Sequence, residues 1–492
     1  MHHGMNEKAQ MKHKILSNLS WKFLERGLVQ GVQFIISLFL ARLLLPADYG
    51  VLALVLIFIS IANVFIQSGL NSSLIQKKSV ESIDLSSVFY VSLALATVLY
   101  GFLFVVAPVV ARFYGNEDLT LVLRILALTL FPGVFNSLQN AVVSRTMRFK
   151  KLFFSSIGAG VLSGIVGIIL AYLGYGVWAL VFQHLVSQVS ITIILWITVR
   201  WRPTLEFSFD RVKTLFSYGW KLLVSSLLDT IYRELRSLII GKVYSASVLG
   251  FYNRGQHFPQ LIAKNINGPI QSVLFPALAS QQDYSERVKS MMRRSIVTSS
   301  FIVFPMMIGL AVVAKPLITL LLTEKWLPAV PFMQMFCISY ALWPIQTANL
   351  QAINAMGRSD IFLRLVIIEK AFGVVLLMIS LPFGVYYLAM SEIFTGMIAT
   401  FIYAKPNKKL LGYGYKEQAK DLLPPLCLSL IMGFAVFTIQ YLHFSPIITM
   451  SMQIMAGIVL YFGLAYLCKL ESFDYLLKTV RTYIKKRKKK RA

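Results

Sequence analysis

The chain has 492 residues, of which 57% are apolar and only 14% are charged. Soluble domains of ordinary composition carry about 25% charged residues, so this composition excludes a soluble cytosolic enzyme, a disordered chain and a disulfide-rich scaffold. The 48 Lys and Arg outnumber the 21 Asp and Glu, giving a formal charge of +27, which in so apolar a chain indicates the cytoplasmic loops of a membrane protein rather than nucleic-acid binding.

The N-terminus resembles a signal peptide only in part. Lys8, Lys12 and Lys14 precede an apolar run, but no small-residue cleavage site follows it. We therefore interpret residues 1–18 as a cytoplasmic N-terminal segment that leads into a retained first span.

Apolar runs bounded by charge, Pro or Gly predict an all-α polytopic membrane protein, since about 20 apolar residues span a bilayer. The fourteen predicted helices cover residues 19–44, 49–70, 85–111, 118–142, 152–173, 176–199, 215–241, 247–277, 295–321, 328–354, 360–380, 384–404, 421–442 and 446–468. A polar connector from Trp201 to Lys213 is predicted to be strand-like.

The predicted order is two lobes of six helices followed by two further helices. The predicted segments are an N-lobe (19–200), a cytoplasmic connector (201–214), a C-lobe (215–404), a cytoplasmic loop (405–420), the last two spans (421–468) and a basic cytoplasmic tail (469–492).

The distribution of Lys and Arg among the loops supports this threading. With the N-terminus inside, the inner segments hold 33 of these residues and the outer segments hold 4. If one helix had been missed, every later loop would lie on the opposite side of the membrane and this difference in charge would be lost. We therefore place both termini in the cytoplasm. The tail, which includes Lys485 to Arg491, is expected either to contact anionic phospholipids or to be a solvated retention tail.

Two segments about two hundred residues apart share a pattern. In Ala41–Gly50 and Gly241–Gly250, a basic residue closes one helix and a Gly eight residues later opens the next. A second echo relates Pro132, Leu138 and Gln139 to Pro344, Leu350 and Gln351 at equal spacing. Together these matches predict a parallel six-helix repeat, which implies two lobes around a central pathway and transport by alternating access.

The segments Ala41–Gly50, Ile240–Arg254 and Val273–Leu278 resemble the polysaccharide transporter branch of the MOP flippase superfamily, in particular WzxC/TuaB-type exporters of lipopolysaccharide or exopolysaccharide. The resemblance covers nearly the whole chain. It implies a flippase in a bacterial cytoplasmic (inner) membrane. This flippase would move polyprenyl-pyrophosphate-linked oligosaccharide from the cytoplasmic to the outer leaflet, for O-antigen, exopolysaccharide, capsule or teichuronic-type polymers.

Eleven Lys and Arg fall inside predicted spans, leaving aside Lys315 at the outer end of its span, which is counted with the outer segments. Charges inside spans are costly and should face water or one another. On three spans the polar residues recur at helical spacing, which predicts a common cationic cavity suited to pyrophosphate and saccharide hydroxyls. The predicted substrate-binding residues are Arg26, Arg254, Lys264, Arg233, Lys221, Gln30, Gln33, His257 and Gln260, with Tyr252 and Trp220 as aromatic neighbours. Glu25 and Arg26 also resemble an acid–base pair of the related lipid II flippase.

Other roles remain open for several of these residues. Glu25 with Arg26, and Asp229 with Arg233, can instead be structural ion pairs. Lys22, Arg42 and Arg236 lie near helix ends and can be snorkelling side chains, and His257 can be an ordinary polar residue with its hydrogen bonds satisfied. The candidates for proton or sodium coupling are Asp229, Glu369, Glu392 and Glu25, and the hinge candidates are Pro132, Pro305 and Pro344, which can also be static kinks.

Two rival functions are a cation-coupled multidrug exporter of the same superfamily and a membrane enzyme of polysaccharide assembly. The sequence has no paired-carboxylate, Ser-His-Asp or Cys-His arrangement and no phosphate-binding Gly-rich loop, so we expect no enzyme activity and no cofactor. Cys337, Cys427 and Cys468 lack metal-ligand spacing, so no metal site is predicted. Other polysaccharide-assembly proteins are expected partners.

Overall fold

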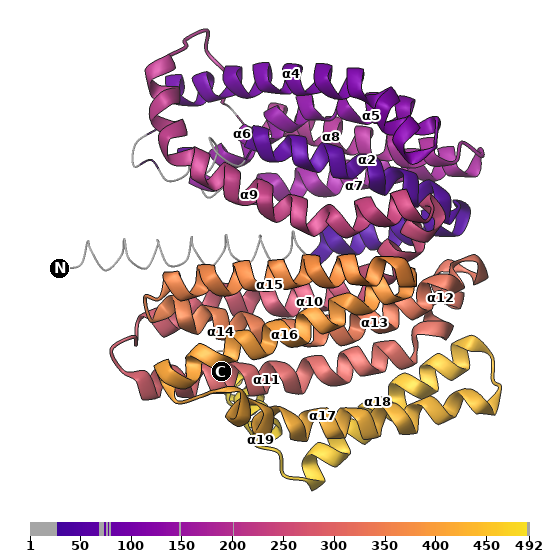
Figure 1. The fold of residues 1–492 in the computed structure, drawn as a ribbon, viewed down its shortest axis with the longest axis vertical. Coiled ribbons are helices and arrows are strands. Elements are labelled where there is room, and N and C mark those ends of the chain that lie inside the picture. The colour runs from indigo at the N-terminus through magenta and orange to yellow at the C-terminus, as the bar shows by residue number, and fades with distance from the viewer. Residues whose placement is uncertain are drawn as a thin grey trace. The chain divides into compact units, whose positions relative to one another are not determined.

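The computed structural model describes residues 27–67, 73–74, 77, 80–146, 149–199 and 201–489, with single-residue or short gaps between these ranges. All regular secondary structure in these ranges is helical, with no strand. It divides into two compact units, Met1–Gly250 and Phe251–Ala492, which we call the first and second unit and describe separately (Figure 1).

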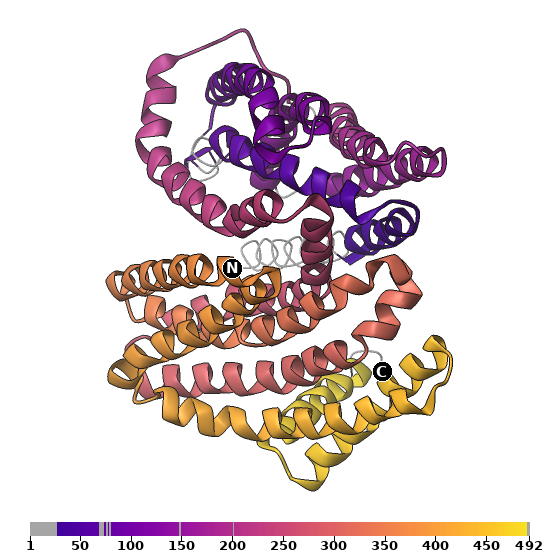
Figure 2. The same ribbon diagram turned by 45° about the vertical axis from the view of Figure 1, so that its right-hand side comes forward.

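Among the described residues, the first unit consists of one helix near the N-terminus and seven labelled helices. After a helix over Gly27–Leu43, it contains α2 (Pro46–Gln67), α4 (Ser82–Tyr114), α5 (Asp118–Ala127), α6 (Leu130–Thr146), α7 (Phe149–Tyr172), α8 (Val177–Thr198) and α9 (Phe209–Val243). α7 and α8 pack along their whole length, and α9 packs on α2 and α4. α9 curves along its length in both views (Figures 1 and 2).

The second unit begins within α10 and ends in the basic tail. Its helices are α10 (Ala246–Ala279), α11 (Ser285–Val312), α12 (Ala314–Leu322), α13 (Val330–Ala341), α14 (Trp343–Ala355), α15 (Ser359–Ser380), α16 (Val385–Leu411), α17 (Tyr415–Phe437), α18 (Pro446–Leu467) and α19 (Glu471–Lys489), with single 3-10 turns at Glu324–Ala329, Leu381–Phe383 and Thr438–Leu442. α11 lies against α13, α14 and α17, and α17 pairs with α18.

Nine helical segments in the described ranges are long and apolar enough to span a membrane. They are Pro46–Gln67, Ser82–Tyr114, Asp118–Thr146, Phe149–Tyr172, Val177–Thr198, Ser285–Val312, Val385–Leu411, Tyr415–Leu442 and Pro446–Leu467. The predicted all-α membrane architecture is therefore confirmed. The other five predicted spans correspond to Gly27–Leu43, α9, α10, α13 with α14, and α15, which are shorter or carry charged residues, so the count of fourteen stays a prediction.

One local expectation needs correction. The connector is not strand-like: residues 201–208 have no regular secondary structure, and α9 begins at Phe209, six residues before the predicted start of that span. Ser208 precedes this helix with an extended backbone, and Asp210 lies in its first turn, where a carboxylate stabilises the helix dipole. In the basic tail, for which no secondary structure was predicted, Glu471–Lys489 forms α19.

The two segments of the sequence echo are in reciprocal contact within the first unit. A Cβ atom at Gly50 would lie 1.7 Å from the carbonyl oxygen of Ala246, and one at Gly250 would lie 2.1 Å from that of Pro46. Pro46 and Gly50 correspond in the echo to Ala246 and Gly250, so each glycine packs against the counterpart of the other's helix start. Only glycine permits backbones to approach this closely, which explains the two matched glycines.

The predicted lobes and the two compact units are defined differently. The lobes follow the repeat, whereas the units follow packing, and α9 packs with the first unit although the repeat assigns it to the C-lobe. The predicted segment boundaries therefore stay predictions.

Candidate functional site

The predicted site residues of the first unit lie on two helices. Gln30 is half-buried and Gln33 is exposed on the helix Gly27–Leu43, whereas Glu25 and Arg26 lie outside the described residues. Lys221 is exposed on α9. Among the described residues, the predicted polar side chains of these two helices therefore lie at or near the surface of the first unit.

Arg233 and its neighbours form the second half of the α9 stripe. The Arg233 side chain is 62% exposed, its Nε lies 3.6 Å from Oε1 of Glu234, and its guanidinium donates to the Thr230 hydroxyl at 3.4 Å. Asp229 is also exposed. Because the side chain is largely exposed, its remaining N–H groups can still donate to an anionic ligand.

The α10 residues of the second unit differ strongly in exposure. Arg254 is only 7% exposed, and its Cζ atom lies 5.3 Å from the ring centroid of Trp326, a cation–π arrangement. Lys264, ten residues later, is exposed. Of the two α10 cations predicted to bind substrate, Arg254 is buried and Lys264 is exposed.

A polar and aromatic group surrounds the middle of α10. The amide of Gln260 donates to the Tyr340 hydroxyl at 3.3 Å, and the amide of Gln256 donates to the same oxygen at 2.8 Å. Tyr340 in turn stacks on Phe336, with ring centroids 5.9 Å apart. The prediction missed Gln256 because it lies one position to the side of the chosen stripe, although Gln256 and Gln260 are separated by one helical turn.

Two further α10 residues are more enclosed than the sequence suggested. The Nδ1 atom of His257 is buried and has no hydrogen-bond partner among the described residues. Tyr252 is 2% exposed and donates from its hydroxyl to Oε2 of Glu392 at 3.3 Å. Tyr252 is thus a packing residue of this unit rather than an open stacking surface for a sugar.

Both embedded acids of the second unit are hydrogen-bonded to tyrosines. Glu392 accepts from Tyr252, and Glu369 accepts a short hydrogen bond from the Tyr403 hydroxyl. Both carboxylates are half-buried. Each of these carboxylates therefore has a hydrogen-bond donor within the second unit.

The predicted hinge prolines fall at two kinds of position. The span that contains Pro132 is broken, with α5 ending at Ala127 and α6 beginning at Leu130. The span that contains Pro344 is broken in the same way, since α13 ends at Ala341 and α14 begins at Trp343. Pro305 instead lies inside the unbroken α11. The two prolines that match in the sequence echo, Pro132 and Pro344, therefore each follow a break in the helix. The role of these prolines and of Pro305 as hinges stays a prediction.

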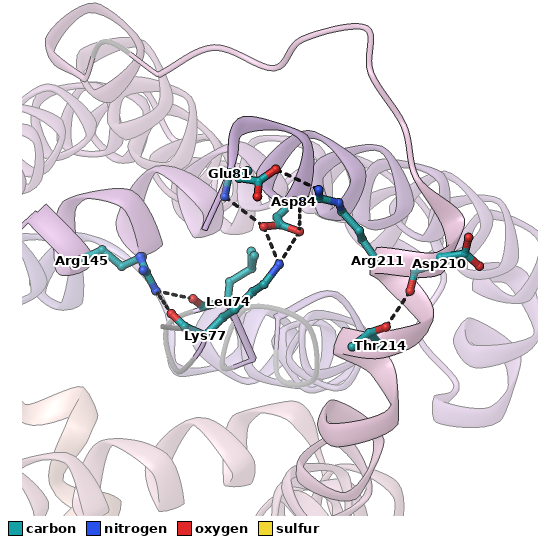
Figure 3. A network of polar contacts seen from close by, with 8 residues as sticks. All are labelled: Leu74, Lys77, Glu81, Asp84, Arg145, Asp210, Arg211 and Thr214. Carbon is teal, nitrogen blue, oxygen red and sulfur yellow. Dashed lines mark hydrogen bonds and ion pairs between the residues drawn. The ribbon is translucent and has the colours of Figure 1, made fainter. Parts of the chain in front are cut away.

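A network of ionised groups in the first unit was not anticipated from the sequence (Figure 3). Asp84 is fully buried, and its carboxylate accepts from Lys77 Nζ at 2.7 Å and from Arg211 at 3.1 Å. Arg211 also pairs with Glu81 at 2.8 Å. One carboxylate thereby joins the start of α4, the segment before it and the start of α9.

The same region is tied together by hydrogen bonds to backbone oxygens. Arg145 at the end of α6 donates to the carbonyls of Leu74 and Lys77, both at 2.7 Å (Figure 3). Ser86 and Ser87 of α4 accept from the backbone N–H groups of Thr204 and Ser208, both at 2.9 Å. Three chain connections are thus fixed to one another within this unit.

Comparison with known proteins shows the family to which this chain belongs. A family model described as "Polysaccharide biosynthesis protein" matches residues 39–331, more than half of the chain. The chain belongs to this polysaccharide biosynthesis family. The predicted resemblance to the polysaccharide transporter branch is confirmed.

The individual relatives share low sequence identity with this polysaccharide biosynthesis protein but align with most of its length. The succinoglycan biosynthesis transport protein ExoT of Rhizobium meliloti (strain 1021) is 24% identical over 347 residues, which is 70% of each chain. The lipopolysaccharide biosynthesis protein WzxC of Escherichia coli (strain K12) is 22% identical over 427 residues, covering 85% of this chain and 86% of the relative.

A solved structure of the lipid II flippase MurJ in an inward closed conformation shares the fold. It aligns with a TM-score of 0.69 at 15% identity, covering 88% of this chain and 96% of MurJ. At this identity the likeness concerns the fold, which is that of a multi-pass helical membrane protein.

Proposed function

We propose that this chain is a flippase that moves a polyprenyl-pyrophosphate-linked oligosaccharide from the cytoplasmic to the outer leaflet. The observation that carries the proposal is that Lys221, Arg233 and Lys264 are exposed on helices within predicted membrane spans. A cation at the centre of a bilayer costs about 2.5 to 3.5 kcal/mol, so we expect these exposed side chains to face a wet cavity, and a cationic cavity suits an anionic ligand. Membership of a polysaccharide biosynthesis family supports a saccharide cargo.

Each type of residue would serve a different part of the cargo. Arg233 and Arg26 would bind phosphate oxygens with paired hydrogen bonds, while Lys221 and Lys264 would contribute mobile point charges. A larger set would hydrogen-bond saccharide hydroxyls, namely Gln30, Gln33, His257 and Gln260. The buried Arg254 would add to the positive potential from its place over Trp326.

Movement would follow from the repeat. Alternating access would expose the cationic residues first to the cytoplasm and then to the outside, while the polyprenyl tail stays in lipid. Pro132 and Pro344, which follow the two matched helix breaks, and Pro305 are the candidate bending points. The charge distribution of the loops supports cytoplasmic termini in a bacterial inner membrane.

Energy coupling and partners are further parts of the proposal. Asp229, Glu369, Glu392 and Glu25 are the candidates for binding a proton or sodium ion, and removal of product outside is the alternative driving force. The basic tail would contact anionic phospholipids, and other polysaccharide-assembly proteins would receive the cargo. The family match supports this function over a multidrug exporter, and the similarity to a succinoglycan biosynthesis transport protein supports transport rather than an enzyme activity.

The test is an analysis of lipid-linked intermediates in a strain that lacks this chain. We expect one polyprenyl-pyrophosphate saccharide to accumulate on the cytoplasmic leaflet, and the native chain to restore export. Lys221→Gln combined with Lys264→Gln should fail to restore it at normal abundance in the membrane. Lys315→Gln, which removes an exposed cation near the outer end of its predicted span, is the matched control. Unchanged lipid-linked intermediates in the deletion strain would contradict the proposal.

A further inference from the structure

Two aromatic rings and two amides of the second unit meet around Tyr340. Tyr340 is the next-to-last residue of α13, and Trp343 is the first residue of α14. Their ring centroids lie 5.5 Å apart, and their planes differ by 32°. The amides of Gln256 and Gln260 on α10 both donate to the Tyr340 hydroxyl. We call these four side chains the aromatic platform.

The rings of the aromatic platform are held in place by the core of the second unit. Tyr340 stacks on Phe336, which is 1% exposed, with ring planes 23° apart. Tyr340 and Trp343 both pack against a buried apolar cluster contributed by α10, α11 and α13. A ligand that binds these rings would therefore meet side chains that are already ordered, which favours affinity.

The aromatic platform is also partly accessible. All four of its side chains are only half-buried. The indole N–H of Trp343 has no acceptor among the described residues and is not fully buried. Because a tryptophan N–H usually has a partner when it is enclosed, this donor is available to a ligand.

The chemistry of these groups suits a saccharide. A sugar ring has a face of C–H groups that can pack on an aromatic ring, and hydroxyl groups at its edge that donate and accept hydrogen bonds. Among the described residues, none donates to the side-chain carbonyl oxygens of Gln256 and Gln260, so both can accept from hydroxyl groups. None of the four side chains carries a charge, which fits a neutral sugar better than an organic cation.

The aromatic platform lies at the depth expected of a transported substrate. Gln260 and Tyr340 are within two residues of the centres of the predicted spans 247–277 and 328–354. Polar groups at this depth are costly and usually functional. Transporters built from repeats bind their substrates near the bilayer midplane, typically beside interrupted helices, and Tyr340 and Trp343 lie on either side of the break between α13 and α14.

A cation lies on the same face of α10. Gln256, Gln260 and Lys264 follow one another at four-residue spacing, which places them one above another on a helix. Lys264 is exposed. At a rise of about 1.5 Å per residue, it lies about 6 Å along the helix axis from Gln260 and about 12 Å from Gln256. A pyrophosphate bound by Lys264 would therefore bring the attached sugar to the aromatic platform.

We propose that the aromatic platform binds the saccharide unit joined directly to the pyrophosphate. The apolar face of this sugar packs against the Tyr340–Trp343 pair, and its hydroxyl groups bond to Gln256, Gln260 and the Trp343 N–H. The inference rests on the proposed flippase function and extends it by assigning a binding place to the first sugar of the cargo.

A purely structural role of the same side chains predicts a different response to mutation. If the platform only joined α10 to α13, its loss would destabilise the fold but would not change the relative affinities for lipids with and without a sugar. The ratio of two affinities measured on one protein sample is therefore the decisive quantity, because a fraction of misfolded protein does not alter it.

The test is native mass spectrometry of the full-length protein with polyprenyl pyrophosphate, polyprenyl-pyrophosphoryl glucose and polyprenyl-pyrophosphoryl galactose in separate arms. We expect the native chain to bind at least one glycosylated lipid about tenfold more tightly than polyprenyl pyrophosphate. Trp343→Leu, which keeps an apolar side chain against the buried cluster, should reduce this preference to within twofold. Tyr340→Phe should reduce it about threefold, because both amides lose their acceptor.

Two further variants serve as controls. Tyr441→Leu disrupts another aromatic pair of the second unit, since the Tyr441 ring is 64% exposed and lies 6.0 Å from that of Phe437. It should keep the native preference. Lys264→Gln should weaken all three lipids alike, because it removes a charge that the pyrophosphate common to all three would contact.

The outcomes separate this inference from the proposed function. Equal binding of the three lipids by the native chain would overturn the inference, as would a native preference in both Trp343→Leu and Tyr340→Phe, and either result would leave pyrophosphate binding intact. A native chain that binds none of the three lipids would contradict the proposed function and the inference with it.

Discussion

The first and the second unit each contain a cluster of ionised side chains, and the two clusters are built in opposite ways. In the first unit, the carboxylate of Asp84 lies between two cations, Lys77 and Arg211, and is completely buried (Figure 3). In the second unit, the guanidinium of Arg293 lies between two carboxylates, those of Asp421 and Glu471, and is 41% exposed.

This difference in burial predicts which cluster contributes more to the stability of the fold. A buried ion that loses its partners pays a large desolvation cost, whereas an exposed ion is rehydrated. The Asp84 cluster joins three chain connections, while the Arg293 cluster attaches α17 and α19 to α11. We therefore expect mutations to be most harmful at the buried centre and to lose effect as the side chain becomes more exposed.

The largest effect is expected for Asp84→Ala. It removes the acceptor of both cations and empties a fully buried position, so the free energy of unfolding should fall by about 3 kcal/mol. Chemical denaturation in detergent measures this change. Asp210→Ala is the control, because Asp210 is likewise a first-turn aspartate but is exposed on α9. Equal effects of the two substitutions would contradict the distinction.

An intermediate effect is expected for Arg293→Gln. Two carboxylates lose their cation, but only Asp421, whose side chain is 15% exposed, is well shielded from water. The free energy of unfolding should fall by about 1 to 2 kcal/mol, measured in the same denaturation assay. Arg287→Gln on the same helix should change it by less than about 0.5 kcal/mol. A loss larger than that of Asp84→Ala would reverse the ranking.

The smallest effect is expected for Glu471→Gln. This side chain is 73% exposed, and exposed ion pairs contribute about 0 to 1 kcal/mol, further screened by salt. The melting temperature should change only slightly, and the change should vanish when the ionic strength is raised. A shift that persists at high salt would mean that the contact between α11 and α19 depends on this pair more than its exposure indicates.

Sequence reasoning predicted the elements that depend on local or repeated patterns. The apolar runs predicted the membrane helices. Gly50 and Gly250, which match in the sequence echo, lie at a close backbone contact. Pro132 and Pro344, which also match, each follow a helix break. These features could be predicted because they arise from residue type at fixed spacing.

Features that depend on distant pairing could not be predicted. Asp84 meets Arg211, which is 127 positions away, and a single aspartate at a helix start carries no sequence signal for such a partner. The burial of Arg254 and Tyr252 likewise depends on α13 and its neighbours rather than on the α10 stripe itself. Periodicity identifies a polar face, but the packing around that face decides which of its members are accessible.

The most direct test of the proposed function is lipid flipping by the purified chain in vesicles that contain a labelled polyprenyl-pyrophosphate oligosaccharide. The account predicts transfer between leaflets by the native chain and by Lys315→Gln. It predicts at least a tenfold slower transfer by Lys221→Gln combined with Lys264→Gln, because two accessible cations of the spanning helices are lost. Equal rates for the native chain and the double variant would contradict a cationic pathway for the head group.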